Sequence, residues 1–232
     1  QPSPYEDAIT TAQDEAEAIE ISHDDTWSIL YTSGTTGRPK GAMLSYGMTF
    51  YNAINATVAA RLTSASVNLD VLPLFHTAGL NLYANPVFHA GGTVLVERAF
   101  DPGDALAMIG DAALGITIFH GVPAHFLFMS EHPDFGHTDF SHIELAVGGG
   151  APMAVSLLDT FAERGLNIAQ AYGMTEVGPC ALMQPLEDVA ASQGPVGKPV
   201  MHVEARIVDS EGADVTPGDI GELWFKGPNV IT

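Results

Sequence analysis

Short apolar runs alternate with longer amphipathic segments over the first two hundred residues of the chain. The short runs are apolar or β-branched, and they predict strands at 67–72, 93–96, 116–119, 143–147 and 168–172. The longer segments predict helices at 46–62, 101–113, 123–130 and 152–164. Strands and helices that alternate in this way are typical of an α/β fold, with a largely parallel sheet and flanking helices on both faces.

Two of the predicted helices have clear start signals. Ser45 is a suitable N-cap for the first, whose apolar face should contain Met48, Tyr51, Ile54, Asn55 and Val58. Asp101 is a suitable N-cap for the second, and Pro102 favours its first helical position. The buried stripe of this second helix should contain Ala105, Met108, Ile109, Ala112 and Ala113.

The pattern changes from Gly194 onward. Two short apolar runs, 203–208 and 223–225, are separated by turn-forming residues and predict the start of a small antiparallel β subdomain. The turn-rich stretch at 192–197 marks a predicted boundary. We therefore expect an acidic lead-in at 1–26, an α/β subdomain at 27–193 and the β subdomain at 194–232.

Composition narrows the classes of partner. Twenty-eight acidic and eight basic side chains give a formal net charge of -20, which disfavours nucleic acids and anionic membrane surfaces. No stretch approaches the ~20 apolar residues that a membrane span requires. Cys180 is the only cysteine, so an intrachain disulfide is excluded and a reducing, cytoplasmic setting is expected.

The segment 31–41 reads YTSGTTGRPKG and has the composition of a phosphate-binding loop. Gly34 and Gly37 permit tight turns, and a loop of this kind can direct backbone N–H groups at an anion. Hydroxyl groups and a mobile positive charge come from Thr32, Ser33, Thr35, Thr36 and Lys40. Pro39 occupies the position of the second glycine in a Walker loop, so the Walker pattern fails. The loop should lead into the helix at 46–62, which is the geometry of an anion site.

Five further motifs follow in order: PLFHTAG at 73–79, GGGAP at 148–152, QAYGMTE at 170–176, GPVGKP at 194–199 and GELWFKGPNV at 221–230. Their order and spacing resemble the acyl-adenylate-forming (AMP-binding) superfamily, which includes fatty-acid and aryl-acid CoA ligases, luciferases and peptide-synthetase adenylation domains. The resemblance covers the chain from about Asp24 to its end. It implies that a carboxylate attacks the α-phosphate of ATP, releasing pyrophosphate, and that the thiol of coenzyme A then takes the acyl group.

The resemblance also implies roles for individual residues. Lys40 and the loop residues Thr32, Ser33, Gly34, Thr35, Thr36 and Gly37 would hold the ATP phosphates. Thr175 would lie at the α-phosphate and Glu176 on Mg²⁺, while Tyr172, Gly149, Gly150 and Ala151 would receive adenine. His76 would lie beside the substrate carboxylate, as a hydrogen-bond donor or an aromatic gate. The acyl pocket would contain His76, Thr77, Ala78, Gly79, Leu80, Gly148 and Gly173, with further lining from 80–85 and 121–125.

These pocket segments are small or apolar, which favours an apolar or aromatic carboxylic acid as substrate. The other histidines have plainer interpretations. His89, His120 and His125 are predicted to be core histidines satisfied by backbone groups. His132, His137 and His142 recur at a spacing of five along a polar loop, which does not suit a metal site. Cys180 lacks an evident base partner and is predicted to serve packing.

The family pattern continues beyond this chain. The sequence stops before the Y-x-T-G-D segment whose aspartate contacts the ribose, and before the C-terminal lid domain with its catalytic lysine. The chain is therefore expected to be a fragment of a longer ligase, with little turnover by itself. An adenylation domain that loads a carrier protein and a non-catalytic nucleotide-binding module remain alternatives. The acid, the final acceptor and a homodimer are left open.

Overall fold

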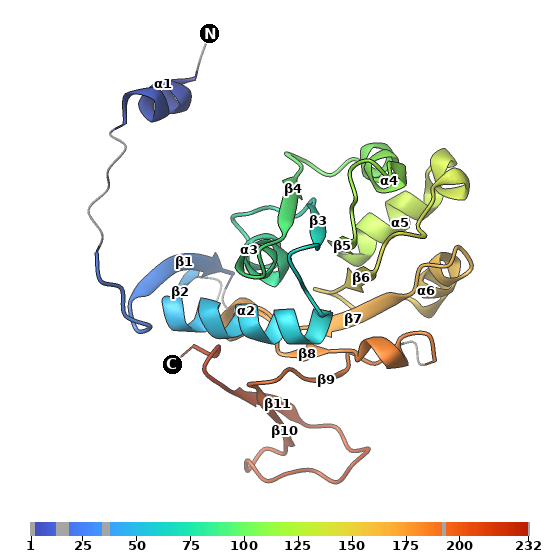
Figure 1. The fold of residues 1–232 in the computed structure, drawn as a ribbon. Helices are drawn as coiled ribbons and strands as arrows, with labels where there is room; N and C mark the ends of the chain where they lie inside the picture. The colour runs from blue at the N-terminus through green and yellow to red at the C-terminus, as the bar shows by residue number, and fades with distance from the viewer. Residues whose placement is uncertain (1–2, 13–18, 34–37, 192–193, 232) are drawn as a thin grey trace.

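The computed structural model describes residues 3–12, 19–33, 38–191 and 194–231. Its centre is a seven-stranded sheet in the order β4-β3-β5-β6-β7-β8-β9 (Figure 1). The first five of these strands are parallel, and the last two join antiparallel. The strands are β3 (Val67–Asp70), β4 (Thr93–Val96), β5 (Ile118–Gly121), β6 (Leu145–Gly148), β7 (Ile168–Tyr172), β8 (Leu182–Met183) and β9 (Lys198–Pro199). The predicted α/β class is confirmed.

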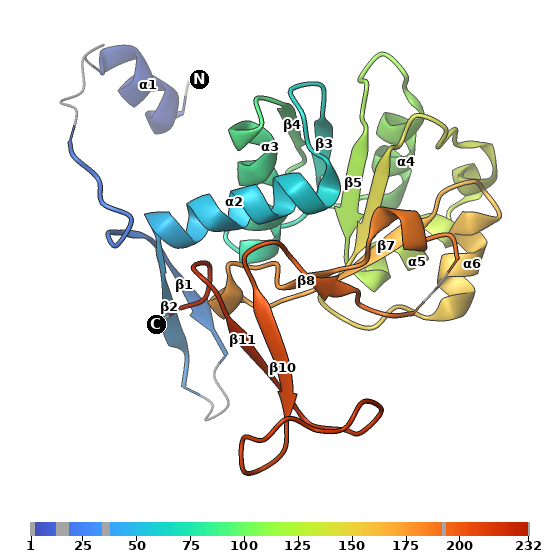
Figure 2. The same cartoon turned by 60° about the horizontal axis from the view of Figure 1, so that its bottom comes forward.

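Helices cover both faces of this sheet (Figure 2). One face packs against α2 (Tyr46–Ala60), the π-helix η1 (Ala78–Ala84) and α3 (Asn85–His89), and the other against α4 (Pro102–Gly110), α5 (Pro123–Glu131) and α6 (Val155–Ala162). Neighbouring strand residues alternate between the two cores. Ile118 belongs to the first core and Phe119 to the second, as side chains of successive strand residues must point to opposite faces.

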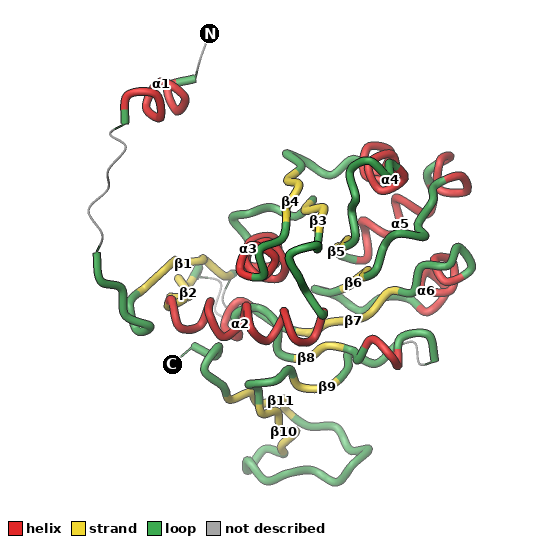
Figure 3. Tube along the Cα trace, in the orientation of Figure 1, coloured by secondary structure: helices red, strands yellow, loops and turns green. Residues whose placement is uncertain are grey.

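The described residues on either side of the glycine loop form a pair of strands, which we call the hairpin, rather than a helix start. Strands β1 (Thr26–Thr32) and β2 (Lys40–Ser45) pair antiparallel beside α2 (Figure 3). Ala42 and Leu44 are buried, whereas Ile29 and Met43 are exposed. The expected direct passage from loop to helix is wrong, because six residues of β2 intervene. The residues 34–37 lie outside the described part of the chain.

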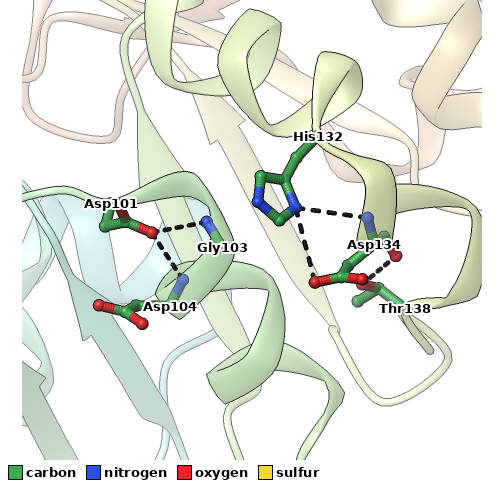
Figure 4. A network of polar contacts seen from close by, with 6 residues as sticks. All are labelled: Asp101, Gly103, Asp104, His132, Asp134 and Thr138. Carbon is green, nitrogen blue, oxygen red and sulfur yellow. Dashed lines mark hydrogen bonds and ion pairs between the residues drawn. The ribbon is translucent and has the colours of Figure 1, made fainter.

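The predicted helix starts are confirmed, but part of each predicted face is wrong. The Ser45 side chain accepts from the Met48 N–H at 3.1 Å, and the Asp101 side chain accepts from the N–H groups of Gly103 and Asp104 (Figure 4). Val58 is half exposed, because α2 turns the buried side chains Asn52, Ala53, Asn55 and Ala56 inward. The helix α4 ends at Gly110, so Ala112 and Ala113 lie beyond it and are exposed.

Predicted strand and helix ends shift by one to three residues. The strand at 67–72 ends at Asp70, those at 116–119 and 143–147 each begin two residues later, and the helix at 152–164 is shorter at both ends. The strands at 93–96 and 168–172 match. In the described residues of the acidic lead-in there is one short helix, α1 (Pro4–Thr11), which Ser3 caps and which has no buried residue.

The predicted antiparallel unit is present as β10 (Glu204–Val208) paired with β11 (Glu222–Lys226). Asparagine side chains connect its ends to the α/β part. Asn55 Oδ1 accepts from the His202 N–H at 3.1 Å, and Asn229 Nδ2 donates to the Val177 carbonyl at 2.7 Å. The boundary at 192–197 stays a prediction.

Candidate functional site

A cavity of about 740 Å³ lies at the carboxyl ends of the parallel strands, where open α/β sheets bind their ligands. Four loops that follow β3, β5, β6 and β7 line it, and the end of β1 closes one side. The walls therefore come from five segments that are far apart in the sequence. The loop after β7 contains the short 3-10 helix η3 (Thr175–Val177).

Most of the predicted site residues meet at this cavity. Those that line it are Thr32, Ser33, His76, Thr77, Ala78, Gly149, Gly150, Tyr172, Gly173, Thr175 and Glu176. Those that the structure places outside the lining are Lys40, Gly79, Leu80, Gly148 and Ala151. Gly34, Thr35, Thr36 and Gly37 lie outside the described residues.

The hairpin brings the phosphate-loop residues to the edge of the cavity. Thr32 at the end of β1 is directly opposite Lys40 at the start of β2. Thr32 is half-buried in the cavity wall, and the Lys40 side chain is exposed. A long, mobile lysine at this position can direct its ammonium group toward an anion at the cavity rim.

Thr175 and Glu176 follow β7 and occupy the opposite wall. Thr175 is 9% exposed and Glu176 is half-buried. The Glu176 carbonyl accepts from the Ile231 N–H at 2.8 Å, which fixes its backbone. No described residue forms a hydrogen bond or an ion pair with the Glu176 carboxylate. Within the described ranges, no three acidic, histidine or cysteine side chains gather as a metal site. The Glu176 carboxylate is chemically suited to a hard cation such as magnesium.

Tyr172 and the glycines beside it give the cavity a flat, open section. The Tyr172 side chain is partly exposed, and its ring centroid lies 6.0 Å from that of Phe225. Gly149 donates its N–H to the Gly121 carbonyl at 3.2 Å, which joins the loops after β5 and β6. A Cβ at Gly173 would overlap the Pro179 carbonyl oxygen, so this close approach requires glycine.

His76 is exposed at the cavity mouth, and its ring is held by its own loop. The Ala78 N–H donates to His76 Nδ1 at 3.1 Å. Nδ1 is therefore the acceptor, and the proton of the neutral ring lies on Nε2. This leaves an N–H donor free to meet an oxygen in the cavity.

Two histidines that were predicted to be core residues line the same cavity. His120 is fully buried, and its Nδ1 lies 3.2 Å from the side-chain Oδ1 of Asn68. His125 stacks on Phe100 with ring centroids 4.2 Å apart, and burial lowers its pKa. His89 is exposed at the end of α3. The prediction is wrong for His89, which is exposed, and for His125, which is only half-buried, whereas His120 is a buried core histidine beside the Ala78 backbone, as predicted.

Cys180 also lines the cavity, but its thiol is unreactive. The thiol is buried and donates to the Leu182 carbonyl at 3.8 Å. Burial raises its pKa to about 12, so it stays protonated and is a poor nucleophile near pH 7.

Two of the three evenly spaced histidines, His132 and His142, make local structural contacts. The His132 ring accepts from the Asp134 N–H at 3.3 Å and caps the 3-10 helix η2 (Pro133–His137), as Figure 4 shows. His142 Nε2 lies 2.6 Å from the Ile109 carbonyl. His137 is the last residue of η2 and is exposed.

The family of the chain follows from its similarity to known proteins. A family model described as AMP-binding enzyme matches residues 1–232. The chain therefore belongs to the AMP-binding enzyme family, the acyl-adenylate-forming superfamily that its motifs indicate. Among curated relatives, a feruloyl-CoA synthase of an Amycolatopsis species is 37% identical over 223 residues, covering 96% of this chain and 45% of the relative. An indoleacetate–CoA ligase of Aromatoleum aromaticum is 36% identical over 203 residues, covering 88% and 39% respectively.

Solved structures agree in fold. ATP-bound MatB from Rhodopseudomonas palustris superposes with a TM-score of 0.87 at 32% identity, over 97% of this chain and 44% of that one. O-succinylbenzoate CoA synthetase from Bacillus subtilis, in complex with ATP and magnesium, gives 0.82 at 30% identity, over 97% and 46%. The chain spans less than half the length of each of these four proteins.

Proposed function

We propose that this chain is the ATP- and acid-binding part of a carboxylate–CoA ligase. The main support is that the end of β1, the Thr175–Glu176 turn and His76 all line one cavity. These are the groups that an adenylation reaction requires at one place. The similarity to proteins named as CoA ligases supports this reading over a non-catalytic nucleotide-binding module and over a carrier-loading domain.

The proposed reaction has two steps. A carboxylate oxygen of the acid attacks the α-phosphorus of ATP, and the bond to the bridging oxygen breaks to release pyrophosphate. The thiol sulfur of coenzyme A then attacks the acyl carbon, and AMP leaves. Lys40 and Thr32 act on the pyrophosphate end, where charge accumulates in the transition state. Thr175 contacts the α-phosphate, and Glu176 would hold Mg²⁺, which would supply positive charge at the phosphates.

The acid is proposed to be apolar or aromatic. Leu72, Leu82 and Val122 give the cavity apolar walls, and no lysine or arginine among the described residues lines it. An acid with a second negative charge would lose its hydration without gaining a partner. His76 Nε2–H is proposed to donate to the carboxylate of the acid, which orients one oxygen for attack. Two relatives are named for aromatic acids, ferulate and indoleacetate, in agreement with this class.

The test is pyrophosphate release by the protein encoded by the whole open reading frame, with a panel of aliphatic and aromatic acids, ATP and Mg²⁺. We expect release that depends on an apolar or aromatic acid, followed by formation of a CoA thioester when coenzyme A is added. No pyrophosphate with any acid would refute the ligase assignment. The chain 1–232 alone is expected to have little turnover, because positions of the reacting groups that are off by about 1 Å can cost ~100-fold in rate. We expect a cytoplasmic enzyme, and no helix in the described residues is long and apolar enough to cross a membrane.

The role of Glu176 is tested with Glu176→Gln. Removal of the charge that holds magnesium should lower acid-dependent pyrophosphate release by about 100-fold or more and raise the Mg²⁺ concentration needed. Glu163→Gln is the matched control, because Glu163 is exposed at the end of α6 and does not line the cavity. Equal loss in both variants would remove the proposed role from Glu176.

A further inference from the structure

A buried asparagine, Asn52, lies between two walls of the candidate site. It projects from α2, is 1% exposed and does not line the cavity. Its side-chain Nδ2 donates to the Asn81 carbonyl of η1 at 2.7 Å, and its Oδ1 accepts from the Cys180 N–H at 3.4 Å. One side chain thus joins η1 to the loop that follows β7.

On the side of η1, the backbone itself creates the need for this donor. In a π-helix each carbonyl accepts from the N–H five residues later, as the Leu80 carbonyl does from the Asn85 N–H. The next carbonyl in this series belongs to Asn81, and the residue five positions later is Pro86, which has no N–H. Asn52 supplies the missing donor. Because a buried carbonyl without a partner is costly, this hydrogen bond holds η1 at a fixed distance from α2.

The Asn81 side chain carries this restraint on to the cavity. Its Oδ1 accepts from Asn85 Nδ2 at 2.8 Å, and its Nδ2 donates to Thr77 Oγ1 at 3.3 Å. Thr77 lines the cavity next to His76, the residue proposed to meet the acid. We call residues 76–78 the acid wall. Its position therefore depends on where η1 lies against α2.

On the other side, Asn52 holds the loop that follows β7. This loop contains 175–176, the residues proposed for the α-phosphate and Mg²⁺, which we call the phosphate wall. It meets Asn52 at two points, because the Cys180 N–H donates to Oδ1 and a Cβ at Gly178 would lie 3.5 Å from the Asn52 Cβ. The Gly178 N–H donates in turn to the Thr175 carbonyl at 3.2 Å. The phosphate wall is thereby tied to the same asparagine as the acid wall.

We propose that Asn52 is a positioning residue for adenylation, which sets the distance between the acid wall and the phosphate wall. Each wall holds its own substrate, but attack on the α-phosphorus requires both at the right separation, and an error of about 1 Å can cost ~100-fold in rate. The inference rests on the proposed function, because it assumes that the acid and ATP bind at these walls. Loss of Asn52 should therefore slow the reaction of the ternary complex and spare the binding of each substrate alone.

The test uses the protein encoded by the whole open reading frame, ATP, Mg²⁺ and the acid of the panel above that releases pyrophosphate fastest. The variants are Asn52→Leu, which removes both hydrogen bonds from a side chain of similar shape, and Asn52→Asp. We expect kcat of acid-dependent pyrophosphate release at pH 8 to fall by about 10- to 100-fold in both. Calorimetry should give dissociation constants within about threefold of wild type for ATP with Mg²⁺ alone and for the acid alone.

Asn52→Asp adds a pH signature that a loss of packing does not produce. A protonated carboxyl group can donate to the Asn81 carbonyl and accept from the Cys180 N–H, as the amide does, whereas an ionised one repels that carbonyl. Burial favours the protonated form, so the rate of this variant relative to wild type should rise about tenfold from pH 8 to pH 6. Asn52→Leu should show no such rise. Tyr83 and Cys180, the buried titratable groups of the two contacted segments, stay protonated, because burial raises the pKa of each.

Asn55→Leu is the matched control. It removes a second buried asparagine of α2, whose side-chain hydrogen bonds among the described residues go to His202. This control should unfold at a lower urea concentration than wild type, as Asn52→Leu does, but keep kcat within about twofold. A rate loss confined to the Asn52 variants, with substrate affinities kept, supports the positioning role.

Three results would refute that role: unchanged kcat in the Asn52 variants, an equal loss of kcat in Asn55→Leu, or substrate affinities that fall in parallel with the rate. Whichever Asn52 variant folds decides the outcome. Failure of both to fold at pH 6 also refutes the role, because Asn52 would then serve the fold as a whole. A wild-type protein that releases no pyrophosphate with any acid is a different result, which refutes the proposed function and this role with it.

Discussion

At the scale of single residues, Asp70 and His120 combine two opposite pKa shifts within one buried contact. Burial raises the pKa of Asp70 from 3.8 to about 7 and lowers that of His120 from 6.5 to about 4. Between about pH 4 and 6.5 the folded state therefore keeps a proton on Asp70 that the unfolded chain loses, and lacks a proton on His120 that the unfolded chain binds. The two effects on stability have opposite signs and largely cancel as pH changes.

The substitution Asp70→Asn should remove the contribution of Asp70 to the pH dependence of stability and leave that of His120. The stability that protonated Asp70 contributes is present below about pH 4 and is lost as pH rises to about 7, because the folded state holds the extra proton only in that window. The amide can still accept from the Leu72 N–H, as Asp70 Oδ1 does. The free energy of unfolding of the variant, relative to wild type, should therefore rise with pH between about 4 and 7, by up to about 1.4 kcal/mol per unit.

Urea unfolding at pH 4.5, 5.5, 6.5 and 7.5 measures this difference. Asp159→Asn on α6 is the control, since Asp159 is exposed. Its difference from wild type should stay within about 0.5 kcal/mol throughout. A flat difference for Asp70→Asn would show that the carboxyl group titrates alike in the folded and unfolded states.

Gly173 is required for a different reason, the close approach of two backbone segments at the cavity. A Cβ there would overlap the Pro179 carbonyl oxygen, and neither backbone can withdraw without moving β7 or the turn after η3. Gly173→Ala should destabilise the fold by about 2 to 3 kcal/mol. Gly136→Ala should change stability by less than about 0.5 kcal/mol, because its added methyl group meets nothing within 4 Å. Equal midpoints of the two variants in urea would contradict the packing argument.

At the scale of elements, the alternation of strands and helices was readable because buried parallel strands are continuous apolar runs. The β1–β2 hairpin was not predicted, because apolar and polar residues alternate only weakly along its strands. In addition, its glycine loop has the composition of a loop that precedes a helix. The polar positions in the run 67–72 carried a signal that was not used. Asn68 and Asp70 recur at a spacing of two, which places both on one face of a buried strand, and only the tertiary structure brings His120 to them.

The hairpin also makes a prediction about its two faces. Leu44 is 1% exposed, while its neighbour Met43 is 54% exposed on the opposite face. Leu44→Ala should cost about 2 to 5 kcal/mol, whereas Met43→Ala should cost less than about 1 kcal/mol. Hydrogen exchange of the β1 and β2 amide groups measures the local effect. Because the hairpin carries Thr32 and Lys40, faster exchange in Leu44→Ala should accompany weaker ATP binding, and unchanged exchange would refute the hairpin packing.

At the scale of the whole molecule, the α/β part and the β10–β11 unit are joined by buried asparagines rather than by apolar packing alone. Asn55 and Asn229, which make these contacts, are almost fully buried. Such contacts cannot be predicted from the sequence, because asparagine is usually found in turns or on the surface. Asn55 was predicted on the buried face of its helix, but its partner His202 is 147 residues away. Contacts of this range depend on the completed fold.

Asn229 links this junction to the candidate magnesium ligand. Its side chain donates to the carbonyls of Val177 and Cys180 at 2.7 and 3.4 Å, and two residues later the Ile231 N–H donates to the Glu176 carbonyl. Asn229→Ala removes two bonds to buried carbonyls and should cost about 1 to 3 kcal/mol. Asn167→Ala, at an exposed position, should stay within about 0.5 kcal/mol of wild type.

The variant Asn229→Ala also tests whether Asn229 holds the turn that carries Glu176 or only contributes to packing. If Asn229 holds the turn that carries Glu176, amide exchange of residues 175–178 should accelerate in Asn229→Ala, and the Mg²⁺ concentration needed for ATP binding should rise with it. Loss of stability spread evenly over the sheet, with exchange at 175–178 no faster than elsewhere, would assign Asn229 to packing alone. The position of the magnesium ligand would then be set by β7 and η3, independently of the β10–β11 unit.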